Sequence, residues 1–295
     1  MPRVTAAGHS GPMCHAASVR PPGCSIQTGQ RPSWGSCTYI ATGLPAPRNL
    51  LSASVVVVLA SVVFVPSAPI LVPALAGPRA FEAEPIRACT LAAAADLAAA
   101  AADWVAIGAA DTVDDPALAG CGTFARYGVD VEVSLQAGDH GPAGFLPLSM
   151  LVAAWLREQA GARSVRPVVV APDTEPAECA RIGATLAVDV DAAAGSVGVL
   201  VVGDGAISLS ARAPGGGLRE EAVDLQARID AAIAESDLVS LEALDVAECV
   251  TEGVAGRVAW QVAAALCDDR DVKPELRCAQ APFGVGYDVA VWMPR

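Results

Sequence analysis

Acidic residues are missing from the first fifty positions of this sequence, and basic residues are scarce after them. Residues 1–50 hold Arg3, Arg20, Arg31 and Arg48 but no Asp or Glu, whereas the rest of the chain has 15 basic and 32 acidic residues, a formal charge of −17. A body with this charge repels the phosphates of nucleic acids and the headgroups of anionic lipids. The composition therefore argues against a nucleic-acid partner.

Closely spaced cysteines are also missing. The nine cysteines are widely separated, odd in number and form no CxxC pair. Small disulfide-bonded domains and zinc sites need close, repeated cysteine spacings. A hydrophobic fraction of 53% supplies a core that needs no cross-links. We therefore predict a cytoplasmic chain with ordinary thiols.

No apolar run is long enough to cross a bilayer as a helix. The run over residues 50–65 is stopped by Pro66, Pro69 and Pro73, whereas a spanning helix needs about 20 apolar residues. The run also begins deeper in the chain than the core of a signal peptide does. Its many valines favour a strand buried on both faces. We expect the first core strand here and no membrane partner, with an export signal as the alternative.

Sequence motifs of several common enzyme classes are absent. The chain contains no GxGxxG, no phosphate loop ending in Gly-Lys-Ser/Thr and no GxSxG. The glycine-rich stretch over residues 213–217 therefore predicts a plain flexible loop. Ser67 has no histidine near it in the sequence, which makes it a poor candidate for a nucleophile.

The amino-terminal segment differs from the rest of the chain. It shows no sustained helical or strand period, and prolines such as Pro21, Pro22 and Pro32 punctuate it. We predict that residues 1–52 are a disordered leader or a mis-assigned start and that residues 53–295 form a single domain. A transit peptide is the alternative, although the prolines would interrupt its amphipathic helix.

Strand-like and helix-like segments alternate from residue 55 onward. The expected strands cover residues 55–65, 103–108, 129–135, 168–170 and 197–202, with a strand or hairpin over 281–293. The expected helices are an alanine-rich one over 87–102 and others over 148–156, 225–233 and 258–266. A further helix is expected after Asp173 or Thr174, either of which can cap it, with Pro176 in its first turn. This alternation predicts an α/β fold with a mostly parallel central sheet and helices on both faces.

Polar residues follow two of the expected strands. Ligands of open α/β sheets bind beyond the carboxyl ends of the strands, where Ser67 and the segment Gly203, Asp204 and Gly205 are expected to lie. Asp204 stands between glycines that permit close backbone approach, and it suits a ligand hydroxyl or a cation. A turn aspartate bonded to its own backbone is the alternative. Tyr287 is a further candidate ligand contact, with a core aromatic residue as its alternative.

Several segments together resemble one family. They read VPSAPILVPALAG, LPLSMLVAAWL, VAPDTEPAECARIG, VLVVGDGA, GRVAWQVAAAL and, near the end, APFGVGYDVAVW. On these segments the chain resembles the actinobacterial proteins described as class III extradiol dioxygenase B-subunit-like, from about Val55 to Trp292. The resemblance implies a single α/β domain of the ring-cleaving dioxygenase superfamily.

The resemblance also implies an iron site from which this chain departs. Active members hold Fe(II) with two histidines and one carboxylate, and a further histidine acts as acid and base. Here Ser67 stands where the first histidine is expected and Ile207 where the acid/base histidine is expected. After residue 50 the sequence contains one histidine, His140, in the loop AGDHGPAG. It is the candidate metal ligand, with a solvent-exposed loop histidine as the alternative.

Three hypotheses of function follow. The first is a divergent dioxygenase-like protein that lacks the two-histidine iron site and binds an unknown small molecule at the strand ends, through Ser67, Asp204 and their neighbours. The second is an Fe(II)-dependent ring-cleaving dioxygenase, an oxidoreductase with an unorthodox ligand set. The third is an exported or lipid-associated protein. The sequence leaves open whether the protein is an enzyme and whether it forms a homo-oligomer.

Overall fold

A computed structural model describes residues 59–77, 80–110 and 118–295 of the chain. The predicted leader over residues 1–52 and the first part of the predicted opening strand, residues 55–58, lie outside these residues. The described part is an α/β fold built on a six-stranded, mostly parallel sheet, as the alternation of segments predicts.

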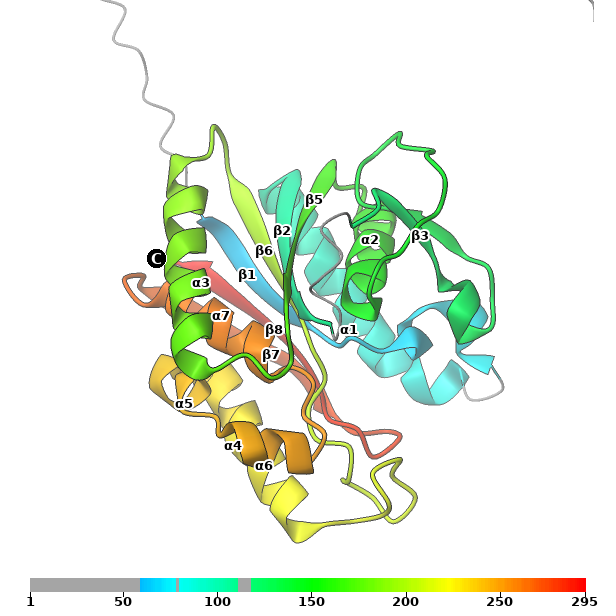
Figure 1. The fold of residues 1–295 in the computed structure, drawn as a ribbon, viewed down its shortest axis with the longest axis vertical. Coiled ribbons are helices and arrows are strands. Elements are labelled where there is room, and N and C mark those ends of the chain that lie inside the picture. The colour runs from blue at the N-terminus through cyan, green and yellow to red at the C-terminus, as the bar shows by residue number, and fades with distance from the viewer. Residues whose placement is uncertain (1–58, 78–79, 111–117) are drawn as a thin grey trace, which may run out of the picture. The chain divides into compact units, whose positions relative to one another are not determined.

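The central sheet has the strand order β5-β2-β6-β1-β8-β7 (Figure 1). Its strands are β1 (Leu59–Val65), β2 (Asp103–Ala109), β5 (Ser164–Val170), β6 (Val197–Val202), β7 (Val272–Gln280) and β8 (Tyr287–Pro294). The first four strands in this order run parallel, whereas β8 is antiparallel to β1 and β7 is antiparallel to β8. The segment over residues 281–293, predicted as a strand or hairpin, forms a turn and the single strand β8, and its antiparallel partner β7 lies before the predicted range. The two strands together form one side of the sheet.

Helices cover both faces of the sheet (Figure 1). One face packs against α1 (Ala80–Ala100) and α2 (Leu148–Ala160). The other face packs against α3 (Pro176–Ala192), α4 (Glu220–Glu235), α5 (Leu238–Glu242), α6 (Val246–Thr251) and α7 (Arg257–Cys267). Helices on both faces explain why the parallel strands read as continuous apolar runs.

Strand β1 shows how the sheet divides the core. Successive side chains of a strand point to opposite faces, so Val63 and Val65 join the core under α1 and α2, whereas Val62 and Phe64 join the core under α7. Both faces of β1 are therefore buried, which is why its sequence shows no polar alternation. Within the described residues, no helix is both long and apolar enough to cross a membrane.

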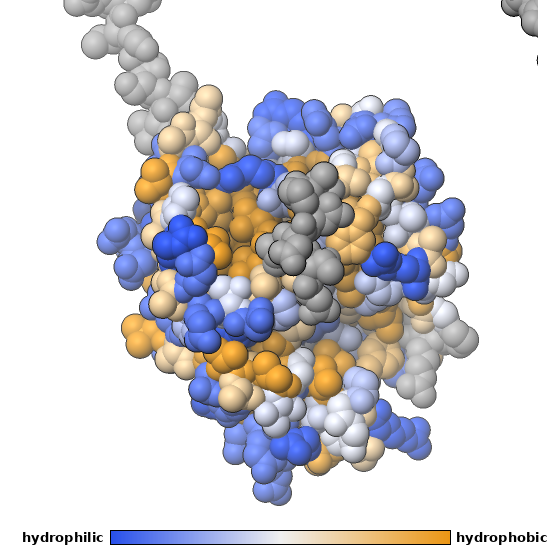
Figure 2. Space-filling view, viewed as in Figure 1, coloured by the Kyte–Doolittle hydropathy of each residue, from blue (hydrophilic) through white to orange (hydrophobic). Residues whose placement is uncertain are grey.

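Charged and apolar residues are unevenly spread over the surface. Figure 2 shows hydrophilic residues around the rim of one face and apolar residues gathered toward its middle. At the edge of the main sheet, the β5 residues Val168 and Val169 are only partly buried. The prediction that residues 168–170 form a fully buried strand was wrong in this respect, since β5 has a neighbour on one side alone.

Two further local predictions needed correction. The strand expected over residues 129–135 shrinks to β4 (Glu132–Ser134), which pairs with β3 (Cys121–Thr123) in a separate two-stranded sheet. A short 3₁₀ helix, η4 (Phe124–Tyr127), and the left-handed Gly128 occupy the chain just before it. The apolar residues there pack on α2 rather than extending the main sheet.

The other correction concerns the start of α3. Its N-cap residue is Glu175, whose side chain makes no capping hydrogen bond, and Pro176 is its first residue. Neither Asp173 nor Thr174 caps it, because the chain turns once more before the helix begins: the Thr174 N–H donates to the carbonyl of Ala171. The fixed φ of proline suits the first helical position.

Trp155 tests the packing of α2 on the sheet. It is 5% exposed and lies in the core under α1 and α2. We expect Trp155→Ala to lower the free energy of unfolding by roughly 3–5 kcal/mol, because it removes a large buried ring. Phe81→Ala is the matched control, since Phe81 on α1 is 72% exposed and should cost little. Chemical denaturation of both variants checks this, and equal, small effects would contradict the packing.

Candidate functional site

The carboxyl ends of β1 and β6 lie side by side and define the candidate site. Val65 pairs with Val202, and the N–H of Gly203 donates to the carbonyl of Val65 at 3.0 Å. The next residues on both strands, including Ser67 and Asp204, therefore leave the sheet together. The structure brings together these two residues, which are 137 positions apart in the sequence.

Asp204 bonds to the other strand end rather than to its own turn. Its Oδ1 accepts a hydrogen bond of 2.6 Å from the backbone N–H of Ser67. Protein surrounds the carboxyl, although part of the residue stays accessible to solvent. Burial raises the pKa of Asp204 to about 7, and the Ser67 hydrogen bond offsets only part of this rise. A carboxyl with such a pKa can donate or accept a proton at neutral pH.

Tyr287 joins Asp204 from the antiparallel side of the sheet. It is the first residue of β8, it is buried, and its ring contributes to the wall of the main pocket. Burial raises the pKa of Tyr287, and the nearby Asp204 carboxylate raises it further. The phenol therefore stays protonated at neutral pH and can donate a hydrogen bond.

The glycines on either side of Asp204 have packing roles. A Cβ on Gly203 would lie 2.4 Å from the Cα of Gly256, and a Cβ on Gly205 would lie 2.0 Å from the Oε1 of Gln226. Both positions therefore need glycine because neighbouring parts of the protein approach closely. Ligand contact by Gly203 and Gly205 stays a prediction.

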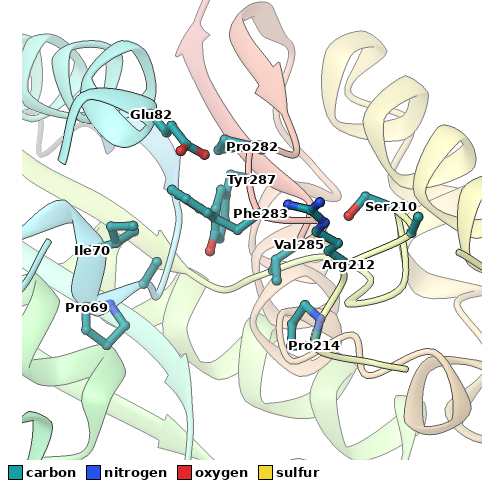
Figure 3. A pocket seen from close by; sticks show the side chains of 12 residues that line it. Pro69, Ile70, Glu82, Ser210, Arg212, Pro214, Pro282, Phe283, Val285 and Tyr287 are labelled. Atoms are coloured by element: carbon teal, nitrogen blue, oxygen red, sulfur yellow. The ribbon is translucent and has the colours of Figure 1, made fainter. Parts of the chain in front are cut away.

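A pocket of about 790 Å³ opens next to these residues (Figure 3). Its apolar walls come from Pro69 and Ile70 after β1 and from Phe283 and Val285 before β8. Its polar side chains belong to Tyr287, Glu82 of α1, Ser210 and Arg212. The pocket is thus mainly apolar, with a few polar groups, as small-molecule sites usually are.

The sequence analysis missed three polar residues of this pocket, Glu82, Ser210 and Arg212. Arg212 lies on the long loop between β6 and α4, and Figure 3 shows it on the opposite side of Phe283 and Tyr287 from Ile70. Its guanidinium makes no hydrogen bond or ion pair with any other described residue. Hydrophobic periodicity does not identify functional residues in loops. The one indication in the sequence was that Arg212 directly precedes the glycine-rich stretch over residues 213–217.

His140 lies away from this pocket. It is exposed on the loop between β4 and α2, in a separate hollow of about 230 Å³ shared with Asp139 and Cys121. The same loop is tied to the start of β5, where the N–H of Ala137 donates to the carbonyl of Arg163. The structure therefore does not bring His140 to Ser67 and Asp204.

The residues at the strand ends do not fit the iron site that the resemblance implies. Ile207, at the expected acid/base position, is held against Gly253 and donates its N–H to the carbonyl of Glu252. In the part of the chain that the structure describes, no three His, Cys, Asp or Glu side chains are grouped so that they could hold a metal ion. His9 and His15 lie outside that part.

Comparison with known proteins does not assign the chain to a family. No model of a protein family matches the chain, and no curated protein matches it. The chemistry of the site therefore carries the functional argument.

The raised pKa of Asp204 predicts how the stability of the folded protein depends on pH. The unfolded chain loses this proton near pH 4, whereas the folded protein keeps it up to about pH 7. The folded state is therefore stabilised relative to the unfolded state at low pH, and stability falls as the pH rises from about 4 to 7. Asp204→Asn keeps an acceptor for the Ser67 N–H but removes this loss.

We expect Asp204→Asn to be more stable than the wild type at pH 8 by about 2–4 kcal/mol and equally stable near pH 4. Urea denaturation across this pH range measures the difference. Asp224→Asn, at an exposed position on α4, is the control and should follow the wild type. Parallel curves for Asp204→Asn and the wild type would mean that folding does not raise the pKa of Asp204.

Proposed function

We propose that this protein binds a small organic acid in the pocket at the strand ends and is a divergent class III extradiol dioxygenase-like protein without ring-cleaving activity. The single observation that carries this proposal is Arg212, a guanidinium with no partner among the described residues at the wall of a mainly apolar pocket. Guanidinium groups bind carboxylates through two parallel hydrogen bonds. The apolar walls suit the carbon skeleton of such a ligand.

Tyr287 and Asp204 extend this proposal to the other end of the ligand. The protonated phenol of Tyr287 lies in the pocket wall, and the Asp204 carboxyl lies close enough to influence it. A ligand hydroxyl or carbonyl oxygen would accept a hydrogen bond from Tyr287. Asp204 holds or releases a proton near neutral pH, so it is the residue to which we assign proton transfer if the protein is an enzyme.

The dioxygenase alternative needs Fe(II), and we assign no step to iron. Two imidazoles and a carboxylate form one face of the iron in such sites. Ser67 supplies a poor neutral ligand, Ile207 supplies none, and His140 belongs to a different hollow. The scaffold is therefore proposed to serve binding, or chemistry that needs only protons.

Binding of a matched pair of probes tests the proposed function. 4-Hydroxybenzoate carries a carboxylate and a hydroxyl, and 4-hydroxybenzyl alcohol replaces the carboxylate with a neutral group. We expect calorimetry to detect the anion and to show at least about tenfold weaker binding of the alcohol, because a hydrogen bond to a charged group contributes about 1.5–3 kcal/mol.

Arg212→Ala should weaken binding of 4-hydroxybenzoate by a similar factor and leave binding of the alcohol unchanged. Arg181→Ala is the control, because Arg181 is exposed on α3 and pairs with Glu178. Equal affinity of both probes, or unchanged binding in Arg212→Ala, would disprove a carboxylate site at Arg212.

Ring cleavage is expected to be absent. After reconstitution with Fe(II) under air, the protein should not open catechol or protocatechuate, since the described residues at the strand ends offer no facial set of three ligands. Absorbance of the ring-opened product measures this. Turnover at an enzymatic rate that disappears in His140→Ala would favour the dioxygenase alternative instead.

A further inference from the structure

Two cysteines from distant parts of the sequence meet where α1 contacts β7. Cys89 is on α1 and Cys278 is on β7. The Sγ of Cys89 donates to the carbonyl oxygen of Arg277, the residue directly before Cys278, at 3.9 Å. The thiol of Cys278 is in turn within hydrogen-bonding reach of the sulfur of Cys89. The two thiols are therefore direct neighbours.

A β-bulge in β7 turns Cys278 toward α1. Leu276 pairs with Ala290 and Cys278 pairs with Val289, so Arg277 is an extra residue in β7. Ala290 belongs to the core under α7, whereas Val289 and Cys278 belong to the core under α1 and α2. Without the bulge, residues 276 and 278 would point to the same face of the sheet. The extra residue therefore places the thiol of Cys278 on the side of Cys89.

The bulge residue also fastens β7 to α1. The Nη1 of Arg277 forms an ion pair of 2.7 Å with Asp96 of α1, and its Nε lies 3.3 Å from Oε1 of Glu275. Asp96 follows Cys89 by about two turns of the helix. The ion pair and the thiol contact thus hold the same two elements together, which keeps the two sulfurs near each other in the folded protein.

The two thiols differ in their access to solvent. Cys89 is half-buried, whereas Cys278 is 8% exposed. Burial, together with the neighbouring Cys89 thiol, raises the pKa of Cys278 to about 12. A cysteine reacts as its thiolate, and the reagent must reach it. A reagent from solvent therefore meets Cys89 first, and Cys278 lies where it can attack the product.

We propose that Cys89 and Cys278 are an oxidation site, which reacts with a low-molecular-weight disulfide and closes to a disulfide between α1 and β7. First, the thiolate of Cys89 attacks one sulfur of the reagent, so a mixed disulfide forms and one small thiolate leaves with the proton that Cys89 lost. The sulfur of Cys278 then attacks that of Cys89, and the second small thiolate leaves with the proton of Cys278. The two protein thiols are oxidised, and the reagent is reduced to two thiols.

The disulfide would link two walls of the strand-end pocket. Glu82 of α1 lies on one side of this pocket, and β7 leads into the turn that contains Pro282 and Phe283 (Figure 3). Formation of the bond requires no ligand in the pocket, so the oxidation site and the proposed organic-acid site can be tested separately.

Mass spectrometry of the full chain tests this proposal. The folded protein is incubated with a modest excess of bis(2-hydroxyethyl) disulfide, the remaining thiols are alkylated, and the peptides are mapped. We expect one disulfide, between Cys89 and Cys278, with the loss of two hydrogens, and dithiothreitol should restore both thiols. In wild-type protein unfolded with urea, this single pairing should be lost to a mixture of pairings, because only the fold holds the two thiols together.

Single variants test the order of the two steps. Cys278→Ser should stop at the mixed disulfide on Cys89, because the second attacking thiol is gone. Cys89→Ser should leave Cys278 as a free thiol, because the reagent does not reach it. Cys121→Ser is the matched control: Cys121 is buried elsewhere, against the carbonyl of Asp139, and this variant should form the same disulfide as the wild type.

Three results would overturn the proposal. The first is the absence of a bond between Cys89 and Cys278, whether both stay reduced or each carries a mixed disulfide. The second is a bond from Cys89 to Cys14, Cys24 or Cys37 in its place. The third is the same mixture of pairings from folded and unfolded protein. A mixed disulfide on Cys278 in Cys89→Ser would contradict the proposed order of attack.

Discussion

The side-chain amide of Gln226 joins the parts of the protein on which the site at the strand ends depends. Its Oε1 accepts the N–H of Ala206 at 2.8 Å, and its Nε2 donates to Asp230 and Asp288. A Cβ on Gly205 or Gly286 would lie 2.0 or 2.2 Å from Oε1. The loop after β6 and the turn before β8 are therefore packed directly on this one amide.

This packing explains the positions of the functional candidates. Gly205 directly follows Asp204, and Gly286 directly precedes Tyr287, so fixing the two glycines against Gln226 fixes both neighbouring side chains. The N–H of Gly205 also donates to the carbonyl of Gly286 at 2.8 Å. A substitution of Gln226 would consequently disturb the strand-end pocket together with the hydrogen bonds to Asp230 and Asp288.

The sequence predicted the parts of the site that follow from apolar runs. β6 was expected over residues 197–202 and is observed there, because six apolar residues in a row need a central position in the sheet. Parallel strands then bring Ser67 and Asp204 to one edge. Arg212 lies in a loop without periodicity, and Gln226 and Asp230 look like solvent-facing positions of the amphipathic helix α4. Gln226 and Asp230 owe their positions in the fold to contacts with β8, about 60 residues later in the chain. No local sequence pattern indicates such distant contacts.

A crystal structure of the protein grown with 4-hydroxybenzoate tests the central claim most directly. The account predicts the carboxylate on the guanidinium of Arg212, the ring against Phe283 and Ile70, and the hydroxyl within hydrogen-bonding distance of Tyr287. Density for the ligand at any other place, or a strand-end pocket filled only by water at saturating ligand, would contradict it.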